Sequence, residues 1–223
     1  MILKPGIKII ALELVLLLVL ISFNLMASLF VLAFLIFSVI FFRNPKRKIE
    51  RGIISPADGK IDYLEGNRLE IFMGPFDAHV NFSPVDGIVK EIKTEGKRVV
   101  PAFLRVKDAK RKKIVIENKA GKFIVTLVAG IFARRILCFV KKGDRIDKGQ
   151  RIGMIVFGSR VVLEIPKGFK FVRKVGEKIK AGETVAISSN SEVLIRQVGG
   201  KVLKILKDIK IADYFTFLNL ISG

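Results

Sequence analysis

The feature that most constrains this chain is an apolar run that extends from Ile9 to Phe42. Its only clearly polar residues are Glu13, Ser22, Asn24, Ser28 and Ser38. A soluble domain does not need so long an apolar stretch, so the run predicts a membrane segment. It is too long for a secretory signal and lacks a small-residue cleavage site, so we expect it to remain on the mature protein.

The length of the run favours a helical hairpin. At about 1.5 Å per residue, one continuous helix would measure about 51 Å, against a hydrocarbon core of about 30 Å. We therefore predict two helices broken near Asn24, with one tilted helix near Leu18–Phe42 as the alternative. Basic residues in the following "FFRNPKRKIERG" predict that the chain after residue 43 is cytoplasmic, and Lys4 and Lys8 put the N-terminus on that side. Residues 1–43 are thus expected to anchor the protein in the cell membrane.

The net charge indicates an anionic partner. The chain has 40 Lys and Arg against 20 Asp and Glu, for a formal charge of +20. Together with the apolar run, this favours anionic membrane phospholipids over nucleic acid, because basic motifs interleaved with aromatic residues are missing from the sequence. The single cysteine, Cys138, excludes an internal disulfide and a cysteine-based zinc site, and we expect no metal.

Residues 44–190 are predicted to form a mainly β domain. Short β-prone runs such as "RLEIFM", "KFIVTLVAG" and "RVVLEIP" alternate there with Gly, Asp and Lys. Residues 191–223 form a C-terminal extension. Its apolar positions from Val202 to Ile209 fit a short amphipathic helix, which either lies on the bilayer or packs on the domain.

Two internal repeats indicate a barrel-sandwich-like arrangement of short, sharply turned strands. "SPADGKI" (55–61) recurs as "SPVDGIV" (83–89), and "VKKGDRIDKGQRI" (140–152) recurs loosely as "VRKVGEKIKAGETV" (172–185). The second pattern resembles half of a biotinyl or lipoyl carrier domain or of an efflux adaptor. A membrane-anchored binding module without catalysis is therefore the alternative function. The sequence, however, lacks the sustained heptads of an adaptor and the lysine that a carrier domain has at a hairpin tip.

Two short segments carry the residue types needed for catalysis. The strand-like "MIVFGSRVVLEIP" is interrupted by Gly158 and Ser159, where a glycine allows a strained turn beside a nucleophile. The only histidine of the chain, His79, lies in "MGPFDAHVNFSPVDG", two residues after Asp77. Asp58, in "SPADG", could approach it only through folding.

The order of these motifs resembles the short form of the phosphatidylserine decarboxylase family. "FFRNPKR…ISPADGKI", "MGPFDAHVNFSPVDG" and "FGSR" follow one another behind a hydrophobic N-terminal segment, and the resemblance extends to about Ile187. It implies that the chain cuts itself between Gly158 and Ser159, that Ser159 becomes a pyruvoyl group, and that fragments 1–158 and 159–223 remain together as a heterodimer. Asp58 and His79 match the family's acidic residue and histidine. The long form has a second histidine where this chain has Phe82, so His79 is expected to serve both cleavage and turnover.

The resemblance also implies the reaction. The pyruvoyl carbonyl would form a Schiff base with the amine of a serine phospholipid, phosphatidylserine or archaetidylserine, and act as the electron sink for loss of CO₂, without pyridoxal phosphate. His79, oriented by Asp58, would be the base that activates Ser159. Arg134, Arg135 and Arg160 are the candidates for contact with the substrate's phosphate or carboxylate.

Overall fold

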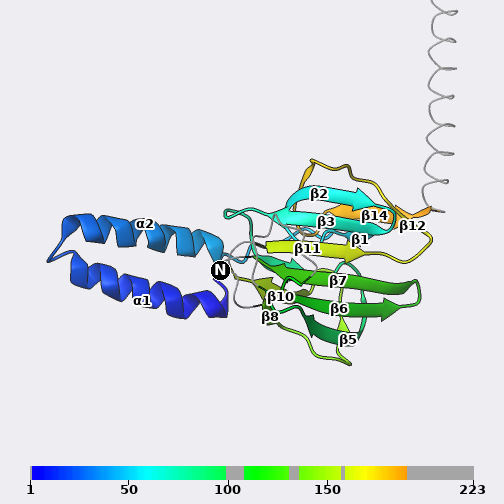
Figure 1. The fold of residues 1–223 in the computed structure, drawn as a ribbon, viewed down its shortest axis with the longest axis horizontal. Helices are drawn as coiled ribbons and strands as arrows, with labels where there is room; N and C mark the ends of the chain where they lie inside the picture. Colours follow the sequence, from blue (N-terminus) through cyan, green and yellow to red (C-terminus); the bar gives the residue numbers. More distant parts are fainter. Residues whose placement is uncertain (1, 99–107, 131–135, 157–158, 190–223) are drawn as a thin grey trace, which may run out of the picture.

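The computed structural model describes residues 2–98, 108–130, 136–156 and 159–189, which form a helical hairpin attached to a β domain (Figure 1). Mainly β architecture behind two N-terminal helices confirms the predicted fold class. Gly158, Arg134, Arg135 and the C-terminal extension lie outside the described residues. Of Ser159, only the backbone is described.

The hairpin consists of α1 (Lys4–Leu20) and α2 (Leu25–Phe41). Asn24 begins α2 as the N-cap residue, and its side chain accepts a hydrogen bond of 3.0 Å from the backbone N–H of Ala27. Asn is a favoured cap because its oxygen satisfies an otherwise unpaired helix amide, which explains why the chain breaks there. The Ser38 hydroxyl joins the two helices by donating a 2.8 Å hydrogen bond to Glu13. Among the described residues, no helix has both the length and the apolar character required to cross a bilayer.

The β domain contains one large sheet and two small ones, all with antiparallel pairing. The eight-stranded sheet has the order β13 (Lys178–Ile179), β2 (Gly59–Glu65), β3 (Arg68–Met73), β11 (Ser159–Glu164), β7 (Gly121–Ala129), β6 (Arg111–Asn118), β5 (Gly87–Glu95) and β9 (Arg145–Ile146). One small sheet contains β1 (Ile53–Ile54), β14 (Thr184–Ser188) and β12 (Phe169–Phe171); the other contains β4 (Val80–Phe82), β10 (Arg151–Ile155) and β8 (Ile136–Cys138). Within the described residues, the large sheet is open, with β13 and β9 as its edges, and does not close into a barrel.

The domain is built from two similar halves. Strands β1 and β2 recur as β4 and β5 at an offset of 28 residues, and strands β8, β9 and β10 recur as β12, β13 and β14 at an offset of 33. The pairings recur as well: β1 pairs with β14 as β4 pairs with β10, and β13 pairs with β2 as β9 pairs with β5. Both sequence repeats therefore correspond to repeated structure. The second half, β4–β10, is inserted into the first half, between β3 and β11.

The hairpin is attached to the domain by the last turn of α2. Phe41 and Phe42 are buried in a small core with Leu3, Val80, Phe82 and Met154. Toward the start of α2, away from the domain, the apolar side chains are exposed, as at Phe30 (76%) and Phe34 (47%). The hairpin consequently projects away from the sheets, with the N-terminus at the junction (Figure 1).

Candidate active site

The chain passes between the two halves twice, and the two connecting segments, called crossings, lie side by side. The chain leaves the first half through residues 74–79 and returns to it after β10, through the segment that leads to Ser159. At one end, the backbone N–H of Ile155 donates to the carbonyl of His79 at 3.3 Å. At the other end, Ser159 pairs with Met73, the last residue of β3. The segment that contains the predicted cleavage bond thus begins beside His79 and ends beside Met73, the residue that precedes the His79 segment.

The His79 imidazole is fully buried and held from two directions. Its Nδ1–H donates to the backbone carbonyl of Asp77 at 2.8 Å, which leaves the lone pair on Nε2. The ring of Phe41 covers the imidazole, with ring centroids 4.2 Å apart and an interplanar angle of 32°. Nε2 is buried and has no hydrogen-bond partner among the described residues. A buried polar atom without a partner is costly, and such atoms commonly mark a functional site.

The environment keeps this histidine neutral. Burial lowers the pKa of His79 to about 4 from its ordinary value of 6.5, because the charged imidazolium would lose its hydration. The hydrogen bond to the Asp77 carbonyl raises the pKa, the charge of Arg43 lowers it, and the charge of Asp58 raises it. At pH 7 the side chain is therefore uncharged and can accept a proton on Nε2.

Asp58 has a structural role that is repeated in the second half. Its Oδ1 accepts a hydrogen bond from the backbone N–H of Ala181 at 2.8 Å, and the equivalent Asp86 accepts one from Lys148 at 2.7 Å. Asp58 differs in being buried and in forming an ion pair with Arg47. Among the described residues it makes no hydrogen bond to His79 and acts on the imidazole through its charge. The acceptor that orients the ring is the Asp77 carbonyl, and a catalytic role for Asp58 stays a prediction.

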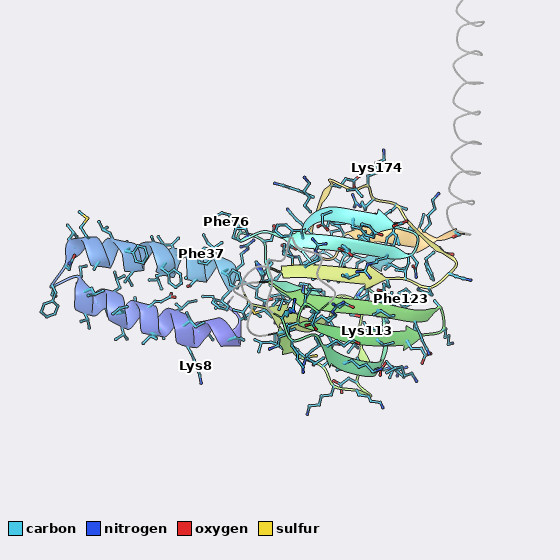
Figure 2. All side chains as sticks on the ribbon, in the orientation of Figure 1. Lys8, Phe37, Phe76, Lys113, Phe123 and Lys174 are labelled. Carbon is cyan, nitrogen blue, oxygen red and sulfur yellow. The ribbon has the colours of Figure 1, made fainter. Side chains whose placement is uncertain are left out.

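The loop that supplies this carbonyl is fastened to the hairpin. Arg43 donates a 2.6 Å hydrogen bond to the carbonyl of Phe76, the residue before Asp77. The rings of Phe37 on α2 and Phe76 meet edge to face at 6.4 Å, at the junction of hairpin and domain in Figure 2. The hairpin therefore positions His79 twice, through Phe41 and through the loop.

Arg160, a candidate for substrate contact, is buried in an ion-pair network. Its guanidinium binds Asp62 at 2.6 Å and also Glu70, which in turn accepts a hydrogen bond from Arg68. Burial raises the pKa of Glu70, but these hydrogen bonds and charges lower it more, so the carboxylate stays ionised. The positive charge of Arg160 is thus already compensated, although the residue lines a cavity of about 410 Å³.

A larger cavity, of about 610 Å³, lies beside the crossing at the base of the hairpin. It is lined by Asp58, by residues 74–77 of the crossing and by the strand pair β2–β13, and its basic residues outnumber its acidic ones five to three. The basic residues are Arg43, Arg47, Lys60, Lys178 and Lys180. It is the natural place for an anionic substrate.

Sequence reasoning did not find Phe41 or the Asp77 carbonyl. Phe41 lies in "FFRNPKR", where the paired phenylalanines at the end of an apolar run give no sign that one of them enters the domain. A backbone acceptor has no sequence signal at all.

Comparisons with known proteins show what this chain is similar to. A family model described as phosphatidylserine decarboxylase matches residues 62–187. An Archaeoglobus fulgidus protein named "Putative archaetidylserine decarboxylase proenzyme" is 56% identical over 167 residues, which cover 75% of this chain and 85% of that protein. A Chlorobaculum tepidum protein named "Phosphatidylserine decarboxylase proenzyme" is 38% identical and covers 69% of this chain and 78% of its own length. Among solved structures, the glucose permease IIA from Mycoplasma capricolum has a TM-score of 0.36 and 16% identity, and the match covers 60% of this chain and 92% of that one.

The family model and these relatives define a decarboxylase, that is, a carboxy-lyase. The chain belongs to the phosphatidylserine decarboxylase family. A non-catalytic carrier or adaptor module is thereby set aside.

Proposed function

We propose that this protein is a pyruvoyl-dependent decarboxylase that converts a serine-headgroup phospholipid to the ethanolamine phospholipid and CO₂, after cutting itself between Gly158 and Ser159. The observation that carries the proposal is the neutral, buried His79 on a crossing that is bonded to Ile155 and that follows Met73, the strand partner of Ser159. The relatives that are named proenzymes support a cleavage step.

In the proposed cleavage, the Ser159 hydroxyl attacks the carbonyl carbon of Gly158. Nε2 of His79 accepts the hydroxyl proton and returns it to the leaving amide nitrogen, so the peptide bond is exchanged for an ester. At pH 7 the imidazole is neutral, so Nε2 is free to accept this proton. Elimination of the ester then removes the Cα proton of Ser159 and expels the carboxylate of Gly158, which becomes the C-terminus of the larger fragment. The dehydroalanine that remains is hydrolysed to the pyruvoyl end and ammonia.

The described residues fit a pyruvoyl group at the start of β11. The unpartnered Nε2 of His79, on the crossing that follows Met73, is a group that can hold or move a proton. Once formed, the group would supply the electron sink for decarboxylation. Phe41 would exclude water from this point, and the cavity lined by Asp77 would admit the headgroup.

The sheet explains how two fragments would remain one molecule. Cleavage would leave β11 at the end of the smaller fragment, 159–223. All six residues of β11 pair with β3 on one side and with β7 on the other, in the middle of the eight-stranded sheet. We therefore expect the fragments 1–158 and 159–223 to separate only on denaturation.

The substrate and the membrane location follow from chemistry on the surface. The exposed apolar side chains of the hairpin, such as Phe30, indicate burial in lipid, and the charge of +20 favours a bilayer with anionic phospholipids. We propose that the hairpin inserts into the cell membrane with the β domain on the cytoplasmic side. The headgroup is common to diacyl phosphatidylserine and ether-linked archaetidylserine, and both names occur among the relatives.

Intact-mass measurement of the purified protein tests the proposal. We expect two chains with the masses of residues 1–158 and 159–223, the smaller one blocked by a pyruvoyl group, and release of CO₂ from a serine phospholipid. Ser159→Ala should remain one inactive chain. A wild-type protein that stays intact, or activity that requires added pyridoxal phosphate, would exclude this mechanism.

A further inference from the structure

The two halves of the domain carry two corresponding cavities. The cavity of about 610 Å³ is lined by β2 and β13, and a second cavity of about 750 Å³ is lined by β5 and β9. The strand registers are equivalent: Ile179 pairs with Gly59 in the first, and Ile146 pairs with Gly87 in the second. Each position in one cavity can therefore be compared with its counterpart in the other.

The counterparts differ in charge. In the first cavity, Lys178 lies directly opposite Lys60, and Lys180 follows on the same edge. The corresponding residues of the second cavity are Arg145, Ile88 and Asp147, an arrangement without net charge. The duplicated framework thus carries a group of three lysines in one half only.

The side chains of these lysines are not held in ion pairs within the described part of the chain. All three are exposed, and none forms an ion pair with a described residue. Of the three acidic residues that line the same cavity, Asp58 is ion-paired with Arg47. Asp77 and Glu183 accept hydrogen bonds only from backbone N–H groups, so the cavity keeps an excess of two basic side chains over acidic ones. Like charges directly opposite on paired strands destabilise a sheet, so an anion bound between Lys60 and Lys178 would remove a repulsion as well as add a contact.

The lysine group shares its cavity with the surroundings of the catalytic histidine. Asp77, whose carbonyl orients His79, lines this cavity, and so does Arg43, which fastens the loop. An anion held at β2 and β13 would therefore leave the rest of its molecule within the same cavity, close to the crossing.

We propose that Lys60, Lys178 and Lys180 form the subsite that binds the phosphodiester of the serine phospholipid. This rests on the proposed function. The subsite would hold the headgroup by its phosphate, while the serine amine and carboxylate extend toward the crossing. The second cavity, with Ile88 and Asp147 at the corresponding positions, would not bind this ligand.

Calorimetric binding of glycerophosphoserine, a soluble headgroup with the same phosphodiester, tests the proposal. The full chain carries Ser159→Ala, so neither cleavage nor turnover enters the measurement. Lys60→Gln/Lys178→Gln is compared with Arg145→Gln/Lys119→Gln, which removes the same two charges from the second cavity. Loss of charge-assisted hydrogen bonds should weaken binding about tenfold or more in the first variant. In the second variant, we expect binding to stay within about twofold because no contact is lost.

Three results would overturn the proposal: no measurable binding, equal weakening of binding in both variants, or no weakening of binding in the first variant.

Inorganic phosphate is the comparison ligand. Binding of phosphate as tight as that of glycerophosphoserine would replace the headgroup subsite by a general phosphate site. In the cleaved enzyme, Lys60→Gln/Lys178→Gln should raise KM for the serine phospholipid in neutral detergent while self-cleavage proceeds normally. Failure of the protein to cleave at all would instead contradict the proposed function.

Discussion

The ring of Phe41, the last residue of α2, covers the imidazole of His79 at 4.2 Å. This contact makes the hairpin, which is the proposed anchor, also part of the surroundings of the proposed catalytic histidine. The hairpin also holds the 74–77 loop through Arg43 and Phe37, so both supports of the imidazole depend on it.

Phe41→Ala should raise the pKa of His79 from about 4 toward 6.5, because water would reach the ring and stabilise its charged form. His79 is the only histidine, so an NMR titration of imidazole signals in the full-length Ser159→Ala chain reports this residue alone. Phe34→Ala, on an exposed part of α2, is the matched control and should leave the titration unchanged. An unchanged titration in Phe41→Ala would show that the contact does not shield the histidine.

Acid should destabilise the protein through the same group. The folded pKa of His79 lies below its unfolded value, so the unfolded chain binds more protons and stability falls as the pH drops from 6.5 to 4. The contribution of this group amounts to about 3 kcal/mol over that window. Denaturant unfolding of the Ser159→Ala chain at several pH values measures it, and His79→Gln should remove that part of the slope. Equal slopes in the two proteins would mean that His79 is not held neutral.

His79→Ala should slow self-cleavage by about 10²–10⁴-fold, since base assistance typically contributes that much. The cleaved fraction is followed by mass over days at pH 7, and cleaved molecules should decarboxylate poorly. Normal cleavage and turnover would make the histidine structural and leave Asp58 or Asp77 as the base.

Asp58→Asn separates the two roles of that residue. An amide oxygen can still accept the Ala181 N–H, so we expect a folded protein, but the lost negative charge should lower the pKa of His79 further. Asp86→Asn, the equivalent change in the second half, should leave this pKa unaltered. Asp58→Ala removes the hydrogen bond too and should cost about 1 kcal/mol more stability than Asp58→Asn. The histidine titration and thermal unfolding measure both effects, and identical titrations in Asp58→Asn and the parent chain would contradict the electrostatic role.

The sequence by itself determined the features that depend on neighbouring residues. The break at Asn24 follows from local capping, and the strands follow from short β-prone runs between turn residues. The repeats at offsets of 28 and 33 residues can be recognised in the sequence alone, and the structure has repeated strands at the same offsets. The single histidine and the Gly158–Ser159 dipeptide marked the candidate chemistry without any structure.

Only the tertiary structure decided which of these features meet. The insertion of one half into the other brings His79 against Ile155 and Ser159 against Met73. It also sets Lys178 opposite Lys60. Such contacts depend on strand registers between segments far apart in the chain, and each register is selected by the packing of the whole sheet. The Asp77 carbonyl orients the imidazole, where Asp58 was expected, because a backbone acceptor two residues away needs only a local bend. Phe41 contacts His79 because the end of an apolar helix is more stable buried in the domain than exposed to water. The sequence of the helix does not predict which residue of the domain Phe41 contacts.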